Sequence, residues 1–380
     1  MNKKKESKVV PNVRFKGFTD DWKQRKLGEV ATFINGRAYS QDEVQNSGKY
    51  KVLRVGNFYT NDSWYFSDME LDEKYYAKDG DLLYTWSATF GPHIWHGDKV
   101  IYHYHIWKVE LSNILEKSFA VQLLEQDKDK ILSDKNGSTM VHITKSGMEQ
   151  KKALLPPSIK EQANIGEYFS NLDHLITLHQ QKITLLIKLK KAMLEKMFPK
   201  KGSVIPEIRF NGFANAWEQR KLSDVVDVCS GRDYKHLSEG DIPVYGTGGY
   251  MLSVSEALSY DKDAIGIGRK GTIDKPYILN APFWTVDTLF YAIPREKIDL
   301  NFAFDIFQNI DWKKKDESTG VPSLSKTAIN EINVLVPQYD EQQALGEFFN
   351  GIDHLITLHQ RKIDKIKNMK KAMLDQMFIQ

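Results

Sequence analysis

Polar and basic side chains gather in glycine-rich segments that are typical of surface loops. Such segments occur in matching pairs along the chain: NGRAYS and SGRDYKHLS, TWSATFGPH and GRKGTIDK, NGSTMVHITK and ESTGVPSLSK. Guanidinium, ammonium, hydroxyl and amide groups on such loops can hydrogen-bond to base edges and phosphates. We therefore treat as candidate nucleic-acid contacts Arg37, Tyr39, Arg54, Asn57, Thr85, Ser87, Thr89, Ser138, Thr139, Arg232, Tyr234, Lys235, Thr247, Arg269, Lys270, Thr272, Ser318, Thr319 and Ser323.

Patterns for catalysis, cofactor binding or metal binding are weak by comparison. A dinucleotide fingerprint is formally present at 266–271, but the segment after it is rich in β-formers and is interrupted by Pro276, where the fingerprint needs a helix. The histidine cluster has no cysteine in the same half of the chain and no counterpart in the second half; its members are His93, His96, His103 and His105. We expect no catalytic residue, no metal site and no cofactor bound by this chain.

The composition indicates a globular protein of two or three domains. The chain has 380 residues, 12% of them aromatic, and a formal net charge of +3, which is modest for a nucleic-acid binder. A single cysteine, Cys229, excludes a disulfide framework and favours a reducing compartment. Because no apolar run has the length of a signal peptide or a membrane span, we expect a cytoplasmic protein with no membrane partner.

An internal repeat organises the elements that must position these loops. The segment 11–30 returns at 206–225 with 11 of 20 positions identical, and the segment 157–198 returns at 337–378 with 23 of 42 identical. The inserts between the repeated segments have diverged, although the segment from Gly80 can still be laid over the segment from Asp263. The repeat predicts one fold that is used twice and carries two different surfaces.

The segments 157–200 and 337–380 each predict a helix of about 35–38 residues. Their apolar positions alternate in steps of four and three, which is the heptad seam of a coiled coil. We expect an antiparallel pair centred on the two histidines, because a parallel pair would bury Lys190 against Lys370; the lysine heads should then reach solvent. The expected pairing residues are Phe169, Leu172, Ile176, His179, Ile183, Leu186, Phe349, Ile352, Ile356, His359, Ile363 and Ile366.

The inserts consist mainly of short strand patterns bounded by Gly, Asp, Asn and Pro, with few helical stretches. We therefore expect an α+β fold in which two small globular domains, at 1–156 and 201–336, are joined by the two long helices of an antiparallel coiled coil with a pseudo-twofold internal repeat. Two core helices of separate domains would be the simpler alternative, but the strict alternation of the heptad steps argues against it.

The repeated motifs resemble one known family, the specificity subunits of Type I restriction–modification systems. The resemblance covers essentially the whole chain. It rests on the pattern F-x-G-F-x-x-x-W-x-x-x-K-L at Phe15 and Phe210, the pattern P-x-x-x-E-Q at Pro157 and Pro337, and the string DHLITLH inside each long helix.

The resemblance implies that each insert is a target recognition domain for one half of an asymmetric, bipartite sequence in double-stranded DNA. The helices would set the spacer and dock two methyltransferase subunits, and restriction subunits with motor and nuclease activity would be further partners. S-adenosylmethionine, ATP and Mg would belong to those partners, so that this chain is not itself an enzyme. A duplicated protein- or glycan-binding scaffold without DNA specificity is the alternative that the repeat alone leaves open.

Overall fold

The computed structural model describes residues 10–59, 61–87, 89–133, 143–316 and 318–379. The chain forms two compact units, of which the first consists of two segments and the second of one. The first unit comprises Met1–Leu178 and Ile363–Gln380, and the second comprises His179–Lys362. This division cuts both long helices near their middle, whereas the boundaries expected from the sequence follow the ends of the helices.

The first unit combines three small sheets with helices. Its strands are β1 (Lys23–Lys26), β2 (Ala31–Asn35), β3 (Tyr50–Leu53), β4 (Tyr65–Ser67), β5 (Tyr76–Ala77), β6 (Leu82–Thr85), β7 (Gly91–Ile94), β8 (Val100–Tyr102), β9 (Ile106–Leu111) and β10 (Lys152–Leu155). Its α-helices are α1 (Leu27–Val30), α2 (Lys117–Ser133), α3 (Lys145–Gln150) and the first part of α4 (Ile159–Met197). Short 3-10 turns lie at Gln41–Glu43, Val55–Phe58 and Glu73–Tyr75.

The second unit repeats this plan. Its strands are β11 (Glu218–Lys221), β12 (Val226–Ser230), β13 (Glu239–Gly246), β14 (Gly249–Val254), β15 (Ala264–Gly268), β16 (Tyr277–Leu279), β17 (Trp284–Thr285), β18 (Leu289–Pro294) and β19 (Asn333–Val336). Its helices are α5 (Leu300–Asn309), α6 (Lys326–Asn330) and α7 (Tyr339–Met377), whose end returns to the first unit. Short 3-10 turns lie at Leu222–Asp224 and Trp312–Lys315.

Two of the three sheets in each unit correspond strand by strand, and the third has four strands in the first unit and three in the second. The antiparallel order β2-β9-β6-β7 in the first unit matches β12-β18-β15-β16 in the second, and the ladder β1-β10 matches β11-β19. A further sheet, β4-β3-β8-β5, contains one parallel pair, as does its counterpart β14-β13-β17. The predicted α+β fold, used twice with different surfaces, is confirmed.

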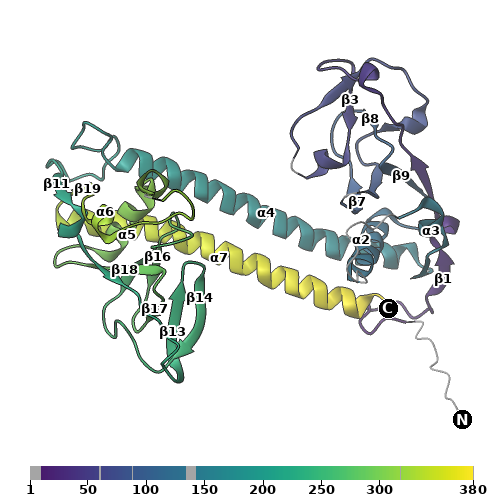
Figure 1. Cartoon of the computed structure of the whole chain (residues 1–380). Coiled ribbons are helices and arrows are strands. Elements are labelled where there is room, and N and C mark those ends of the chain that lie inside the picture. The colour runs from purple at the N-terminus through teal and green to yellow at the C-terminus, as the bar shows by residue number, and fades with distance from the viewer. Residues whose placement is uncertain (1–9, 60, 88, 134–142, 317, 380) are drawn as a thin grey trace, which may run out of the picture. The chain divides into compact units, whose positions relative to one another are not determined.

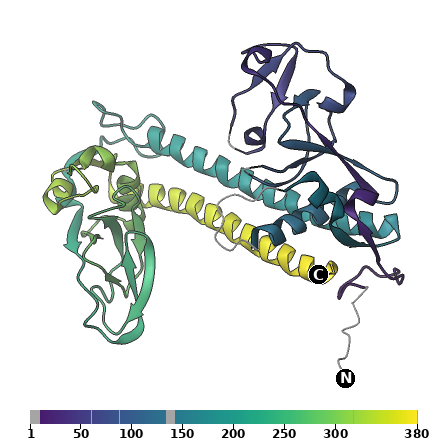
Figure 2. The ribbon, with the colours of Figure 1, turned by 45° about the vertical axis from the view of Figure 1, so that its right-hand side comes forward.

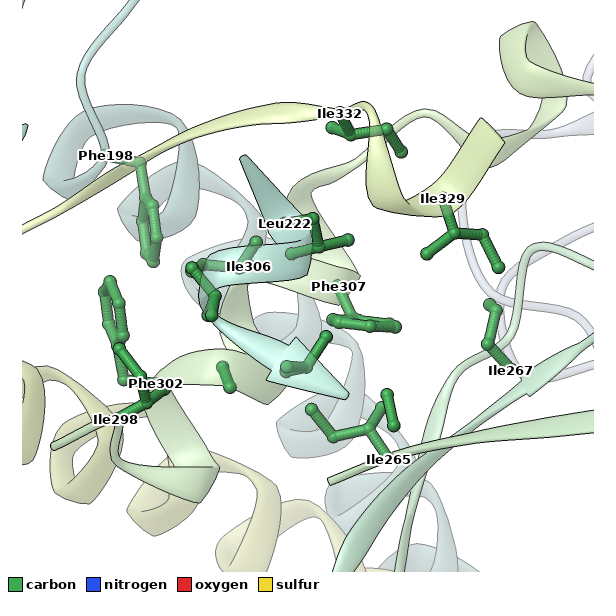
Figure 3. Packing of buried hydrophobic residues seen from close by; sticks show 14 of the residues in the cluster. Phe198, Leu222, Ile265, Ile267, Ile298, Phe302, Ile306, Phe307, Ile329 and Ile332 are labelled. Atoms are coloured by element: carbon green, nitrogen blue, oxygen red, sulfur yellow. The ribbon is translucent and has the colours of Figure 1, made fainter. Parts of the chain in front are cut away.

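Each unit has its own hydrophobic core, built in the same way. In the second unit Phe198, at the end of α4, stacks on Phe302 of α5 with 5.8 Å between ring centroids. Figure 3 shows this stack beside Ile306 and Phe307 of the same core. In the first unit Phe378, at the end of α7, stacks on Phe119 of α2 at 5.2 Å. The end of each long helix thus completes the core of the domain encoded by the other repeat.

The two long helices run antiparallel and lie side by side within each unit (Figures 1 and 2). In the first unit Ile165, Phe169 and Leu172 of α4 share a core with Ile366, Met373 and Met377 of α7. In the second unit Leu186 and Met197 of α4 share a core with Leu345, Phe349, Ile352 and Ile356 of α7. The antiparallel coiled coil that the heptad pattern predicts is therefore confirmed, with 39 residues in each helix.

The two histidines at the centre of the seam contact each other. Nδ1 of His179 lies 2.9 Å from Nδ1 of His359, so that one ring donates and the other accepts. Desolvation, followed by the nearby His179, Lys362 and Lys182, lowers the pKa of His359. A lowered pKa favours the neutral imidazole, in which one ring nitrogen can accept the shared hydrogen bond.

The seam lysines differ from the expectation that their heads reach solvent. Lys190 is only 8% exposed, and its Nζ lies 2.5 Å from Oδ2 of Asp353. Lys370 pairs with Asp173 at 2.6 Å. Each aspartate belongs to the repeated string DHLITLH, and it lies across the seam from the lysine of the other helix. The antiparallel register therefore gives each seam lysine a carboxylate partner, which compensates for the hydration that the ammonium loses in the seam.

In each half, an arginine and a tryptophan of the repeated first segment hydrogen-bond to a buried glutamate in the first turn of a long helix. We call this set of contacts the latch. Glu161 is fully buried, and its carboxylate accepts from Nε and Nη2 of Arg14 at 2.6 and 2.8 Å and from Nε1 of Trp22 at 3.4 Å. The second copy of this latch consists of Arg209, Trp217 and Glu341. The arginine, the tryptophan and the glutamate of the sequence motifs are thus one structural device.

A glycine in each long helix allows a second helix to approach closely. A Cβ at Gly166 would lie 2.5 Å from the backbone nitrogen of Phe119, and one at Gly346 would lie 2.9 Å from that of Phe302. Such distances are too short for a carbon atom, and the neighbouring atom is backbone that cannot rotate away. Only glycine at this position lets α2 and α5 pack against the long helices.

This packing predicts that alanine at Gly166 destabilises the protein, although alanine has a higher helix propensity than glycine. Gly166→Ala should lower the free energy of unfolding by about 1–3 kcal/mol, because overpacking outweighs the gain in propensity. The control is Gly351→Ala, at an exposed site in α7 with nothing within 4 Å of the added Cβ, which should raise it by up to about 1 kcal/mol. Equal effects of the two changes in urea denaturation would contradict the close approach.

In the part of the chain that the structure describes, no helix is both long and apolar enough to cross a membrane.

Candidate nucleic-acid interface

A pocket in the first unit brings together two of the predicted contact residues. Tyr39 and Arg54 line it with Tyr65 and His103, and its volume is about 300 Å³. The guanidinium of Arg54 lies 4.1 Å from the centre of the Tyr65 ring. Burial lowers the pKa of His103 to about 4 and raises that of Tyr39 far above its usual range, so both rings are neutral at physiological pH. The pocket therefore offers one cation among neutral aromatic groups.

Arg37 and Asn57 lie nearby but are engaged within the protein. Nη2 of Arg37 donates to Glu43 at 2.5 Å, and the guanidinium lies 5.3 Å from the Tyr39 ring. This pairing lowers the pKa of Glu43. Nδ2 of Asn57 donates to the carbonyls of Asn61 and Ser63 at 2.9 Å. Neither of these two side chains lines the pocket.

The segment after β6 contains predicted contacts with different exposure. Thr85 is fully buried, and its hydroxyl donates to the carbonyl of Gly91 at 3.3 Å, so it supports the sheet and presents no surface to a ligand. Ser87 is half-buried and Thr89 is exposed. Ser138 and Thr139 lie outside the described residues.

In the second unit the structure gathers three predicted residues around a polar pocket. Arg269, Lys270 and Ser323 line it together with Asp287, Thr288 and Leu324, and its volume is about 410 Å³.

Hydrogen bonds to Asp316 hold the loop that contributes Ser323. Oδ1 of Asp316 accepts from the backbone nitrogen of Ser323 at 2.9 Å and from the hydroxyl of Ser318 at 2.8 Å. These bonds lower the pKa of Asp316. Thr319 and Thr272 are exposed. They are close in sequence to residues of the pocket but do not line it.

The remaining predicted contacts of the second unit lie apart from this pocket. Arg232 and Lys235 are exposed, and the carbonyl of Arg232 accepts from the indole of Trp284 at 2.9 Å. Tyr234 packs against the cluster that contains Trp284, and Thr247 is half-buried at the turn between β13 and β14. None of these four lines the Arg269 pocket.

Several residues that line the two pockets were not among the predicted contacts, such as Tyr65 and His103 in the first unit and Asp287, Thr288 and Leu324 in the second. Also not predicted were Trp86, Tyr104 and His105, which lie outside the first pocket, at the end of β6 and before β9. The sequence did contain a signal for them, because the faint correspondence between the segments from Gly80 and Asp263 pairs Trp86 with Arg269 and His105 with Thr288. The sheet registers agree with this pairing, since Thr85 lies opposite Ile106 in the first unit and Gly268 lies opposite Leu289 in the second.

Of the predicted histidine cluster, His93, His103 and His105 pack against other rings, whereas His96 is exposed and lies 3.5 Å from Asp79. His93 stacks on Phe58 with ring centroids 4.1 Å apart, and burial lowers its pKa to about 4. Within the described residues, no group of three or more His, Cys, Asp or Glu side chains is placed to hold a metal ion.

The helix pair carries a second apolar stripe that the seam does not use. We call it the flank stripe; its exposed members are Leu175, Leu178, Leu185, Leu189, Leu355, Leu358 and Met369. Leu185 is 62% exposed. Equivalent positions of an antiparallel pair lie on the same side of the seam, so in the second unit Leu185 and Leu189 share a face with Leu355 and Leu358. An apolar face of this kind is typical of a surface that binds another protein.

Comparison with known proteins gives consistent matches along the chain. A family model described as Type I restriction modification DNA specificity domain matches residues 19–211 and again residues 214–368. The chain is 25% identical to the Type I restriction enzyme MjaVIII specificity subunit of Methanocaldococcus jannaschii, over 94% of this chain and 92% of that protein. It is 23% identical to the putative MjaX specificity subunit of the same organism, with the same coverage.

Two solved structures share the fold. The crystal structure of a Type I restriction–modification S subunit from M. genitalium matches with a TM-score of 0.71 and 17% identity, over 97% of this chain and 99% of that one. A chain from a study of complex assembly and conformational transition in the type I R-M system matches with a TM-score of 0.52 and 13% identity, over 95% and 98% of the two chains.

Proposed function

Because the chain belongs to the Type I restriction–modification DNA specificity family, we propose that its two inserts each read one half of an asymmetric, split target in double-stranded DNA. The observation that carries the proposal is the repeat itself. One sheet plan, β2-β9-β6-β7 and β12-β18-β15-β16, is used twice, and equivalent edges of the two sheets bear different side chains. Two readers of one fold with different surfaces suit a target with two different halves.

The family membership confirms the sequence-based identification of a DNA specificity subunit. Specificity subunits are the DNA-recognition components of these systems rather than the catalytic ones. None of the comparisons favours the alternative of a protein- or glycan-binding scaffold. We take residues 1–156 and 201–336 as the two recognition domains, and residues 157–200 and 337–380 as the helices that join them.

The flank stripe supports a proposal about partners. We infer that two methyltransferase subunits dock against this face of the helix pair, where exposed leucines on both helices offer an apolar surface to partner helices. Those subunits would supply S-adenosylmethionine and flip the target adenine out of the duplex. Restriction subunits would join the complex with ATP and Mg, and the assembled complex would act in the cytoplasm.

Exchange of one insert tests the modular reading of DNA. Replacing residues 226–336 with the corresponding insert of another family member should change one half of the modified sequence and leave the other half unchanged. The measurement is long-read detection of modified adenines in cells that express the chain with its methyltransferase partner. Replacing residues 31–156 is the matched control and should change the opposite half. A change in both halves after either exchange would refute the proposal.

Lengthening the helices tests whether they set the spacer. Seven residues inserted into each long helix beside its seam histidine would preserve the heptad pattern and add about 10.5 Å, which is about three base pairs. We expect the unspecified gap in the modified sequence to grow by about that number. The same insertion in the connecting segment 201–205 should leave the gap unchanged. An unaltered gap in the lengthened protein would count against the helices as the ruler.

A further inference from the structure

The edge of the main sheet is built in the same way in both units but carries different chemistry. After β6, the backbone nitrogen of Trp86 donates to the carbonyl of His105 at 3.2 Å, and after β15 that of Arg269 donates to Thr288 at 2.9 Å. The side chains of the same two residues donate to the carbonyl one residue earlier in the partner segment. Nε1 of Trp86 donates to the carbonyl of Tyr104 at 2.9 Å, and Nη1 of Arg269 donates to that of Asp287 at 3.3 Å.

This matched pair of side-chain bonds holds an indole in one unit and a guanidinium in the other at the same place on the same fold. We call the place the reading edge; it consists of Trp86, Tyr104 and His105 in the first unit and of Arg269, Lys270, Asp287 and Thr288 in the second. Substitution at equivalent positions that keeps the backbone bonds and changes the exposed groups is what two readers of different sequences require.

The reading edge of the second unit is built to bind a charged or polar partner. Arg269, Lys270 and Asp287 are all exposed at the 410 Å³ pocket. The antiparallel bridge between Lys270 and Ser323, and the bond from the nitrogen of Leu324 to the carbonyl of Arg269 at 2.9 Å, fix the backbone on both sides. Among the described residues, the Lys270 ammonium and the Asp287 carboxylate have no side-chain partner.

The reading edge of the first unit contains neither lysine nor arginine. Trp86 stacks on Trp107 with 5.8 Å between ring centroids and meets His105 edge-on at 5.1 Å. Tyr104, which is 39% exposed, covers the same corner. The surface that remains is aromatic and largely apolar, which suits contact with a thymine methyl group rather than the acceptor edge of guanine.

Resting on the proposed function, we propose that the reading edge is where the two half-sites are told apart, and that the second unit reads a G·C pair there. Arg269 supplies two parallel donors to O6 and N7 of guanine, and Asp287 accepts from N4 of the paired cytosine. Lys270 contacts a phosphate and positions the domain without selecting a base. The first unit, with its aromatic edge, reads a position that does not require G·C.

The experiment uses the full chain in complex with its methyltransferase subunits and a library of DNA targets randomised in both half-sites. In the second half-site, Arg269→Ala should reduce discrimination at one G·C position by about 5- to 100-fold and leave the other positions intact. Arg269→Lys keeps the charge but loses the two parallel donors, so it should show the same loss of selectivity with binding largely retained. Lys270→Ala should weaken all targets alike and lower the slope of log affinity against log salt by about one.

Trp86→Ala is the matched variant at the equivalent place, and it should relax a position in the first half-site only. If the unaltered complex selects a split sequence but neither Arg269 variant changes its second half, the inference is overturned while the proposed function stands. If the unaltered complex selects no sequence at all, the proposed function itself fails.

Discussion

Replacing Glu341 with alanine should lower the free energy of unfolding of the second unit by about 3–5 kcal/mol. The carboxylate is 1% exposed and accepts from Nε and Nη2 of Arg209 at 2.7 and 2.6 Å and from the indole of Trp217 at 3.3 Å. Its removal would leave a guanidinium that is 12% exposed with no counter-charge, and an indole N–H with no acceptor. Breaking a buried pair costs far more than the pair contributes, because the remaining charge stays desolvated.

Two further variants separate the causes of this loss. Glu341→Gln keeps the shape and one acceptor oxygen but not the charge, so its loss should be smaller than that of the alanine variant. Glu347→Ala removes an exposed carboxylate from the same helix and should change stability by no more than about 0.5 kcal/mol. Guanidinium denaturation followed by tryptophan fluorescence provides the measurement. If the Glu341→Ala protein unfolds at the same denaturant concentration as the unaltered protein, the latch does not stabilise the unit.

Replacing Asp305 with asparagine should stabilise the protein at neutral pH by about 1–3 kcal/mol, because it removes a buried carboxyl group whose ionised form the burial disfavours. Asp305 is 1% exposed, and its Oδ2 has no hydrogen-bond partner among the described residues. The groups that face it are Lys190 from α4, Asp353 from α7 and Asp299 at the start of α5. Burial raises the pKa of Asp305 well above its usual value, and Lys190, already paired with Asp353, only partly opposes this effect.

The sign of the pH dependence follows from this direction. The folded protein holds the proton of Asp305 more tightly than the unfolded chain, whose carboxyl titrates near pH 3.9. The free energy of unfolding should therefore fall as the pH rises from about 4 through the folded pKa. The advantage of Asp305→Asn should be absent below about pH 4, grow across that window and then stay constant. Parallel stability curves of the two proteins from pH 4 to pH 8 would contradict this account.

The first unit supplies the reciprocal experiment. Gln122 occupies the equivalent place in α2, is 3% exposed, and donates from Nε2 to Asp173 at 3.2 Å beside Lys370. Gln122→Asp would add a second carboxylate beside Asp173 and should introduce the pH dependence that Asp305→Asn removes. The two repeats thus differ by one buried carboxyl group at a point where their folds coincide.

The fold could be predicted from the sequence wherever the repeat and the heptad pattern acted together. The periodic spacing of apolar residues fixes which face of each helix is buried, and the clash of Lys190 with Lys370 selects the antiparallel orientation. The partners of those lysines were not predicted, because Asp173 and Asp353 lie outside the apolar steps and become neighbours only when both helices are placed.

The candidate interface was less predictable, because exposure depends on tertiary packing. Thr85 and Arg269 both occur in loop-like polar segments, yet Thr85 closes a buried strand and Arg269 is exposed at a pocket. Asp287 contributes to the same pocket from the turn before β18, 18 residues further along the chain. Local sequence identifies the kind of loop, and strand register determines which side chains meet.

The division of the long helices between the two units affects the order in which the protein folds on the ribosome. All residues of the second unit, 179–362, have been translated before the final segment that the first unit needs. Trp22 and Phe119 then still await Phe378, with which they form ring contacts at 6.3 and 5.2 Å. The unit whose translation begins first therefore closes its core only after the second unit has been translated, and until Phe378 has emerged its apolar surface is open to chaperones.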